Sequence, residues 1–204
     1  MNEEKSETLK EIKRSFRLFM DGATSSSMRK KGLNYKINWG IPLPSLRKIS
    51  KGYGKNFDLA IELWKEPIRE CKIMATYIMP AERMSRELVD VWMEAVDNQE
   101  LAELIAFNLL KNLSFAPSLA YEYIASEKKM LQICGYQLLA TLFADGKEPN
   151  ERGINEFLDQ VQTALKSGEM GIKHSAYNCV CRFCELGDIY EQVAIKALSE
   201  FDLL

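Results

Sequence analysis

The chain has 204 residues, of which 47% are hydrophobic and 27% charged, and its formal net charge is −2. A chain of this size and composition is typical of a globular protein whose core needs neither metal nor disulfides, and no apolar run approaches the roughly 20 residues of a membrane-spanning helix. The charged N-terminus lacks the apolar run of a secretion signal, and the cysteine count of five is odd. We therefore expect reduced thiols and a cytoplasmic location.

The charges are divided unevenly along the chain. Residues 1–55 carry thirteen Lys and Arg against five Asp and Glu, a balance of +8, whereas residues 56–204 carry fourteen against twenty-four, a balance of −10. A phosphate backbone responds to the local field of the basic segment, so the acidic total does not argue against a polyanionic partner. A solvated basic helix face on an acidic protein is the alternative.

Helical periodicity begins at the N-terminus, where apolar residues recur three and four positions apart. We expect a break at Gly22 and at residues 25–27. Gly40 and the two prolines that follow it predict a loop, and Pro44 suits the first turn of the next helix. The expected segments are helices at 3–19 and 26–31, a loop at 34–44 and a helix at 44–51.

From residue 57 onward the pattern indicates helices in pairs, separated by short turns. Ser85, Asn98 and Asn150 are placed to cap helix N-termini, because their side-chain oxygens can accept the free backbone N–H groups there. The expected helices are 57–65, 67–78, 85–95, 99–113, 117–126, 130–144, 150–167, 171–186 and 189–201.

Leu59, Leu88, Leu119 and Ile154 begin successive pairs, at steps of 29, 31 and 35 residues. A helix pair that repeats at about this length without a fixed consensus is typical of an α-solenoid of HEAT type. We therefore expect an all-α fold, in which residues 1–204 form one curved α-solenoid domain of antiparallel helix pairs. Residues 1–55 would supply its basic N-terminal helices and residues 56–204 its helix-pair repeats. Its concave face would suit an extended ligand such as a duplex, and an irregular helical bundle is the alternative.

The cations of the first quarter are candidates for contacts with phosphates. Four of them, between residues 10 and 17, share one helix face. Phosphate contacts position a protein on DNA without reading its sequence. Intrahelical pairing is the alternative, but five acids are too few to neutralise thirteen cations. The candidate DNA-binding residues are Lys10, Lys13, Arg14, Arg17, Arg29, Lys30, Lys31, Lys36, Arg47, Lys48 and Lys51.

Three cysteines near the C-terminus raise the question of a zinc site. In a helix Cys179 points away from the face that Cys181 and Cys184 share, and no second cysteine pair is present, so we expect small buried thiols and no metal. His174 shares a face with Asn178, but no group is placed to orient its ring for catalysis. The sequence also lacks nucleotide-binding and metalloprotease motifs, and we expect no cofactor.

The helix expected at 99–113 begins with polar residues although the rest of it is apolar. Gln99 and Glu103 share one face, and Glu103 lies beyond the first turn, where complementing the helix dipole is a weak explanation for a carboxylate. Gln132 and Gln137 are uncharged polar residues in another apolar helix. Each of these side chains is a candidate to face a groove.

Three stretches form a recognisable pattern: Gly40-Ile-Pro-Leu-Pro44-Ser-Leu46-Arg47-Lys-Ile49, Leu59-Ala60 with Leu63-Trp64, and Ile68-Arg69-Glu70 with Ile73 and Ala75. Through residues 28–80 the chain resembles the DNA alkylation repair family of AlkD-like DNA glycosylases, and it does so more loosely to about Leu186. The resemblance implies a solenoid of HEAT-like repeats that grips duplex DNA with a concave, cationic face. It also implies excision of positively charged N-alkylated purines without metal or cofactor.

The active site that this resemblance implies is altered here. The Trp-Asp-x-x-x-Asp-like stretch of the family corresponds to residues 99–103, so Glu103 keeps the second carboxylate, one methylene longer, and Gln99 stands in place of an indole. A second family tryptophan falls on Asn178, and a family arginine falls on or beside Gln132. The resemblance thus implies that Glu103 is catalytic, stabilising the oxocarbenium and the attacking water, and that the other three contact substrate.

Loss of both indoles removes a cation–π attraction of about 0.5–2 kcal/mol per contact with an alkylated purine. Tyr136 or Tyr177 is a candidate to replace them. Three functions therefore stay open. The first is a glycosylase for N-alkylated purines, the second a non-catalytic scaffold that recognises distorted or branched DNA by shape, and the third a solenoid whose acidic half binds a basic protein. The expected partner is double-stranded DNA, alkylated or distorted, and no membrane is expected.

Overall fold

The computed structural model describes residues 3–201, with side chains from residue 7 onward. Over that range the regular elements are all helices, apart from one isolated parallel bridge between Ile37 and Ile68. None of the helices described has the length and apolar character required to cross a membrane. The all-α class predicted from the periodicity is confirmed.

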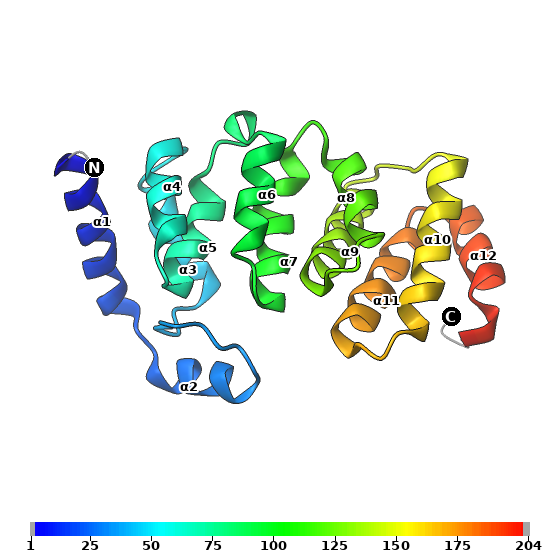
Figure 1. Cartoon of the computed structure of the whole chain (residues 1–204), viewed down its shortest axis with the longest axis horizontal. Coiled ribbons are helices and arrows are strands. Elements are labelled where there is room, and N and C mark those ends of the chain that lie inside the picture. The colour runs from blue at the N-terminus through cyan, green and yellow to red at the C-terminus, as the bar shows by residue number, and fades with distance from the viewer. Residues whose placement is uncertain (1–2, 202–204) are drawn as a thin grey trace. The chain divides into compact units, whose positions relative to one another are not determined.

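The chain divides into two compact units, Met1–Leu104 and Ile105–Leu204. Helix α7 (Gln99–Asn108) contributes its first residues to one unit and its last residues to the other. The other elements of the first unit are α1 (Glu3–Phe16), η1 (Arg17–Phe19), α2 (Gly22–Lys30), α3 (Leu43–Lys51), α4 (Phe57–Lys65), α5 (Arg69–Ile78), η2 (Ala81–Arg83) and α6 (Arg86–Glu94) (Figure 1). Those of the second unit are η3 (Leu110–Asn112), α8 (Ala116–Ile124), α9 (Lys129–Ala144), α10 (Glu151–Lys166), α11 (Met170–Cys184), α12 (Asp188–Ala197) and η4 (Ser199–Phe201).

In the first unit α5 is central, packing against both α3 and α4, and α1 packs against α4. The apolar stripe predicted for the first helix faces inward, since Ile12 and Phe16 are fully buried. Trp64 of α4 and Trp92 of α6 stack in parallel with their ring centroids 4.2 Å apart. Each helix therefore buries one face, as its apolar spacing predicts.

In the second unit α9 packs against α8 and α11, and α11 also contacts α10 and α12. Gly135 allows the α8–α9 contact, because a Cβ at this position would lie 2.7 Å from the backbone nitrogen of Ile124. Phe143, Phe157 and Phe183 form an aromatic cluster with centroids 5.2–5.5 Å apart. These contacts bury α9 on nearly all sides, from Ile133 to Phe143.

The three predicted N-terminal caps are confirmed. The Ser85 hydroxyl accepts from the backbone nitrogen of Leu88 at 3.3 Å, and the Asn98 side chain accepts from that of Leu101 at 3.0 Å. In the second unit the Asn150 side chain accepts from Gly153 at 2.8 Å.

The predicted break at Gly22 and residues 25–27 is wrong, because one helix, α2, runs through it. Asp21 caps this helix by accepting the backbone N–H groups of Ala23 and Thr24, at 2.9 and 3.0 Å. Ser25 does not interrupt α2, because its buried hydroxyl is used by the tertiary structure and donates to the carbonyl of Asn38 at 2.8 Å. The expected helices 3–19 and 99–113 are shorter, ending at Phe16 and Asn108 before the short 3-10 turns η1 and η3.

Residues 31–42, between α2 and α3, form the predicted loop, which begins three residues earlier than expected. Gly40 has a positive φ of +73°, and a Cβ there would lie 2.1 Å from the carbonyl oxygen of Asp21. Only glycine permits this close approach of the loop to the start of α2. The loop also pairs with the residues before α5, since Ile37 accepts from the backbone nitrogen of Arg69 at 2.9 Å and donates to the carbonyl of Pro67 at 3.2 Å.

Candidate nucleic-acid interface

A buried ionic network holds the 31–42 loop in place. Arg69, at the start of α5, is 1% exposed and donates from Nε and Nη2 to the two carboxylate oxygens of Glu100, at 2.8 and 2.6 Å. Its Nη1 reaches the carbonyl of Ile41 at 3.0 Å and Glu70 Oε1 at 3.1 Å. This bidentate geometry is the strongest arrangement available to an Arg–carboxylate pair. Burial by itself would lower the pKa of Arg69, but its hydrogen bonds and charge pairing with Glu100 and Glu70 outweigh burial and raise it.

The carboxylates of this network also bind the loop directly. Glu70 is fully buried and accepts from the backbone nitrogens of Trp39 at 3.2 Å and Ile41 at 3.3 Å. The Tyr35 hydroxyl lies 2.9 Å from Glu100 Oε2 and 3.0 Å from the side-chain oxygen of Asn98, and its single hydrogen serves one of the two at a time. Burial, together with the negative charge of Glu100, raises the pKa of Tyr35, so the phenol stays protonated.

We call Tyr35, Arg69, Glu70 and Glu100 the Arg69 network. It connects the loop, the start of α5 and the start of α7. Removing one member of a buried charged pair typically costs about 3–5 kcal/mol, so this connection is stiff. The loop that carries Lys36 is therefore held in a defined position relative to the first turn of α7.

Ten of the eleven predicted DNA-binding cations are exposed. Lys13 is half-buried, with its Nζ 2.7 Å from Glu66 Oε1. Lys10 and Arg14 both lie near Glu7, at 3.5 and 3.7 Å, in surface pairs that contribute little to stability. Within the part of the chain whose side chains are described, the remaining eight make no ion pair: Arg17, Arg29, Lys30, Lys31, Lys36, Arg47, Lys48 and Lys51. Intrahelical pairing therefore accounts for only two of the cations.

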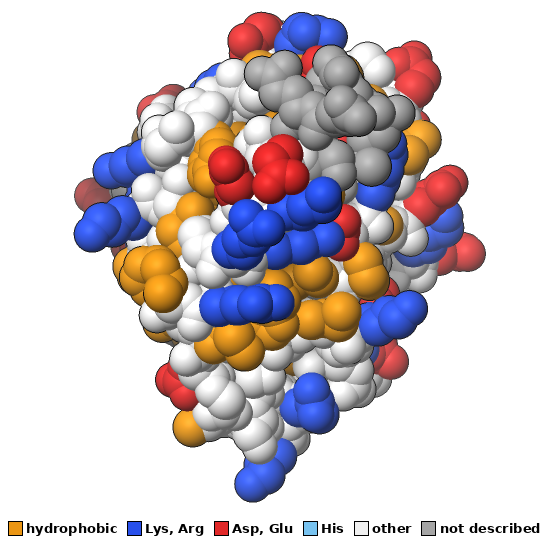
Figure 2. All heavy atoms as spheres, turned by 90° about the vertical axis from the view of Figure 1, so that its left-hand side faces the viewer, with side chains coloured by type: hydrophobic (Ala, Val, Ile, Leu, Met, Phe, Trp, Pro, Cys, Tyr) orange, Lys and Arg blue, Asp and Glu red, His pale blue; other side chains and the backbone are white. Residues whose placement is uncertain are grey.

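Figure 2 shows the end of the first unit that carries α1. Lys and Arg side chains run across this face, and hydrophobic side chains are exposed directly beside them. The large apolar side chains that are exposed among the described residues of the first unit are Leu18, Phe19, Met20, Ile37 and Val91. The surface is thus both cationic and partly apolar, a combination that phosphate contacts alone do not require.

The structure brings together Gln99 and Glu103. The Gln99 side-chain nitrogen donates to Glu103 Oε1 at 2.7 Å, one helical turn along α7, and both side chains are half-buried. Leu101 and Ala102 occupy the buried face of the same helix. Gln99 therefore orients the carboxylate that the resemblance assigns to catalysis.

Asn178 and Gln132 belong to the second unit, whereas Gln99 and Glu103 belong to the first. Asn178 is exposed, lies 3.1 Å from His174 Nε2 and lines an open pocket of about 580 Å³ with Gln137. The Gln132 amide donates to the carbonyl of Ser126, just after α8, so it has a structural partner. A shared substrate site of Asn178 and Gln132 with Glu103 stays a prediction.

The suggestion that Tyr136 replaces a missing indole is wrong. Tyr136 lies on α9 and its side chain is only 1% exposed, so its ring is not accessible to a ligand. Tyr177 is 38% exposed and keeps an accessible ring. We predicted small buried thiols. Cys179 is fully buried, and burial raises the pKa of its thiol, whereas Cys181 and Cys184 are only half-buried. Within the described residues, no group of three His, Cys, Asp or Glu side chains could hold a metal ion.

The Arg69 network was missed at the level of sequence. Its signal is Arg69-Glu70 between the apolar residues Ile68 and Cys71, two adjacent charges at the start of a helix that is mostly apolar after Lys72. Such charges are rarely buried without partners, which would have pointed to a tertiary ion pair. The partner, Glu100, lies 31 residues away in the sequence, and no local pattern indicates it.

Comparison with protein families matches residues 7–180 to the family described as DNA alkylation repair enzyme. The chain belongs to this family. A solved structure is similar over 94% of this chain and 82% of that chain, with a TM-score of 0.84 at 18% sequence identity. It is described as representing a new family of proteins related to the HEAT-like repeat DNA glycosylases with affinity for branched DNA structures. At this identity the likeness concerns the fold, which is an α-solenoid of HEAT-like helix pairs. No curated protein matches the sequence.

Proposed function

We propose that this member of the DNA alkylation repair family binds double-stranded DNA through its phosphates and selects its target by shape. The observation that carries the proposal is the set of eight cations of the first unit that make no ion pair among the described side chains. Cations without acidic partners are available to replace the counterions of a phosphate backbone. Such contacts carry no sequence information, so discrimination between targets must come from the form of the duplex.

Two further observations support this proposal. The Arg69 network fixes Lys36 and its neighbours on a stiff loop, so their spacing is set before DNA arrives. The similar solved structure is described as having affinity for branched DNA, which favours junctions and distorted duplexes as targets. We therefore take branched or distorted DNA, rather than a particular sequence, as the ligand.

The proposal is tested by fluorescence anisotropy with a linear duplex and a three-way junction, at several salt concentrations. Four phosphate contacts predict that affinity falls by about 100-fold between 50 and 200 mM salt. The triple variant R47A/K48A/K51A on α3 should reduce the slope of log K against log salt by about 3. The matched control is K147A/K196A, which removes two exposed cations of the second unit and should leave the slope unchanged.

Equal slopes for both variants would contradict the assignment of the interface to the first unit. Absence of salt-dependent binding to either DNA would overturn the proposal as a whole. In that case the acidic second half becomes the candidate surface, with a basic protein as its partner.

A second candidate function is excision of N-alkylated purines, with Glu103 as the catalytic carboxylate. It is favoured by the hydrogen bond at 2.7 Å from Gln99, which orients Glu103 Oε1 at a half-buried position. A carboxylate held there would stabilise an oxocarbenium ion at the sugar and position the attacking water. The missing indole at Gln99 weakens selection of a cationic base.

The assay for this second function is release of 7-methylguanine or 3-methyladenine from alkylated DNA. Activity in the native protein that E103Q abolishes would support it, and E94Q, at an exposed carboxylate of α6, is the matched control. DNA binding without release by the native protein would restrict the function to recognition.

A further inference from the structure

Three consecutive apolar side chains are exposed where α1 ends. Leu18 is 82% exposed, Phe19 40% and Met20 53%, and we call these three residues the apolar tip. Single exposed apolar residues are common on protein surfaces, but contiguous ones mark a binding site more often. The tip lies outside the core of the first unit, although Phe16, immediately before it, is fully buried.

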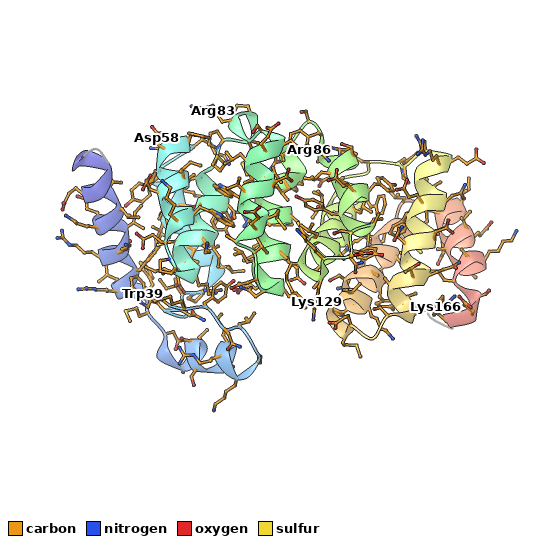
Figure 3. All side chains as sticks on the ribbon, viewed as in Figure 1. Trp39, Asp58, Arg83, Arg86, Lys129 and Lys166 are labelled. Atoms are coloured by element: carbon orange, nitrogen blue, oxygen red, sulfur yellow. The ribbon has the colours of Figure 1, made fainter. Side chains whose placement is uncertain are left out.

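The tip is anchored at both ends to the same residue, Trp39. On one side the Phe16 ring packs edge-on against the Trp39 ring, with centroids 5.5 Å apart. On the other side the backbone nitrogen of Asp21 donates to the Trp39 carbonyl at 2.9 Å, and Asp21 then caps α2. Figure 3 shows Trp39 at the end of α1 that adjoins α2. The three side chains are therefore held outward by a short, doubly fixed turn.

Cations precede the tip along the chain. Arg17 directly precedes it and makes no ion pair within the described side chains, and Arg14 and Lys10 lie on the same face of α1, three and seven residues earlier. Asp21 is the adjacent acid, and its carboxylate is occupied by the backbone N–H groups of α2 and the Thr24 hydroxyl. The tip therefore suits a polyanion that also offers apolar faces.

Two other occupants fit less well. A second copy of the chain, joined by a two-fold axis, would bring Arg14 and Arg17 of each copy close together, which is electrostatically unfavourable. A lipid surface binds amphipathic helices through a free apolar face, but the apolar stripe of α1, from Leu9 to Phe16, is buried within the unit. DNA whose stacking is interrupted offers both phosphates and open base faces.

We infer that the apolar tip is a wedge that inserts between bases at a branch point or bulge, an inference that rests on the proposed function. Phe, Leu and Met are among the side chains that proteins insert between base steps. Unstacking is least costly where stacking is already interrupted, so the wedge favours such sites over a continuous duplex. The exposed cations contact the phosphate backbone of the DNA without regard to its sequence, and insertion of the tip adds affinity only where bases are unstacked.

The test compares a three-way junction that carries 2-aminopurine at its branch point with a continuous duplex of the same arm sequence. We expect the native protein to bind the junction about tenfold more tightly and to increase the 2-aminopurine fluorescence. The variant L18S/F19S/M20S should bind both DNAs within twofold of each other, without the fluorescence change. It should keep the affinity and salt slope of the native protein on the continuous duplex.

L18S/M20S repeats the test with the two most exposed side chains only, in case Phe19 also contributes to folding. I189S changes an apolar side chain of the second unit that is 75% exposed, and it should retain the junction preference. Thermal unfolding verifies that all variants are folded.

A junction preference that survives in both tip variants overturns the wedge while leaving DNA binding through phosphates intact. If the native protein shows no salt-dependent binding to either DNA, this separate result overturns the proposed function. Binding to phosphatidylserine vesicles without any junction preference would assign the tip to lipid and overturn the wedge. Self-association that the tip substitutions abolish, again without junction preference, would assign it to a second copy.

Discussion

Both units of this chain are built from paired helices, but different interactions hold the helices of each unit together. The second unit is held by apolar packing, with Phe143, Phe157 and Phe183 at its centre. The first unit adds the Arg69 network, in which the charged side chains of Arg69 and Glu70 are buried. They also differ in charge, since residues 1–104 carry eighteen Lys and Arg against sixteen Asp and Glu, whereas residues 105–204 carry nine against thirteen.

The first unit needs polar contacts because it contains a long loop, whereas the helices of the second unit are joined by shorter segments. Short turns between helices need only the apolar faces of the helices to pack together. The 31–42 loop presents no helix face that could pack in this way. Trp39 packs on Phe16 and Ile41 is buried, and polar contacts to the loop backbone from Glu70 and Arg69 hold it as well. Buried ion pairs add little net stability but can specify one arrangement, which is what a loop without regular secondary structure requires.

The largest expected effect comes from Arg69→Met. It leaves Glu70 buried without its cationic partner, so the first unit should lose about 3–5 kcal/mol of its free energy of unfolding. Urea unfolding followed by tryptophan fluorescence reports on this unit specifically, because Trp39, Trp64 and Trp92 all lie within residues 1–104. Lys65→Met, at an exposed pair with Glu62, is the control. A loss below about 1 kcal/mol would mean that the network is not stabilising.

Phe183→Ala should have a comparable effect in the other unit, about 3–5 kcal/mol, because it removes a fully buried ring from the aromatic cluster. Circular dichroism should then show helix loss at lower urea than the tryptophan signal does. Met170→Ala, at a side chain that is 75% exposed, should leave both transitions in place. Coincident shifts of the two probes in F183A would argue that the units unfold as one.

Gly40→Ala should cost about 2–3 kcal/mol, since it combines a positive φ with a backbone clash. Because Gly40 holds the loop against α2, junction DNA should also bind more weakly, as anisotropy would reveal. Gly146→Ala carries a similar positive φ in the second unit, where a Cβ meets no atom within 4 Å. It should reduce stability less and leave DNA binding unchanged.

The smallest effect is expected from alkaline pH on the second unit. Burial, with the nearby charge of Glu191, raises the pKa of the Cys184 thiol to about 11. The folded state therefore favours the protonated thiol, and the stability that this contributes is complete below the ordinary thiol pKa and is lost as pH rises through about 11. Unfolding at pH 8, 9.5 and 11 should show a shallower decline for Cys184→Ser. Identical pH profiles would contradict the assignment.

Much of the fold could be predicted because helix formation here is local. Apolar spacing and the caps Ser85, Asn98 and Asn150 mark helices that the structure confirms. The course of α2 could not be predicted, because the Ser25 hydroxyl donates to Asn38 in the loop that follows, outside the helix. Local spacing thus determines where helices form, whereas partners remote in sequence determine how the segments between them lie.

The candidate site divides in the same way. The contact of Gln99 with Glu103 follows from their spacing of four on one helix, and the exposure of most cations follows from their charge. The burial of Tyr136 could not be read from its helix, because neighbouring helices cover α9 on several sides. The exposure of the apolar tip could not be predicted, because Phe19 continues the apolar spacing of α1 after the helix itself has ended.

The Arg69 network also constrains how this sequence can diverge. Replacing Arg69 alone leaves Glu70 buried without a cation, and replacing Glu70 or Glu100 alone takes one of its two carboxylate partners from buried Arg69, so these positions should be inherited as a block or be substituted together. Gln99 is uncharged and does not belong to this network, although it adjoins Glu100 on the helix, so it can be substituted on its own. The residue at position 99 can therefore change while the Arg69 network stays the same. Among homologues we expect position 99 to vary more than positions 69, 70 and 100.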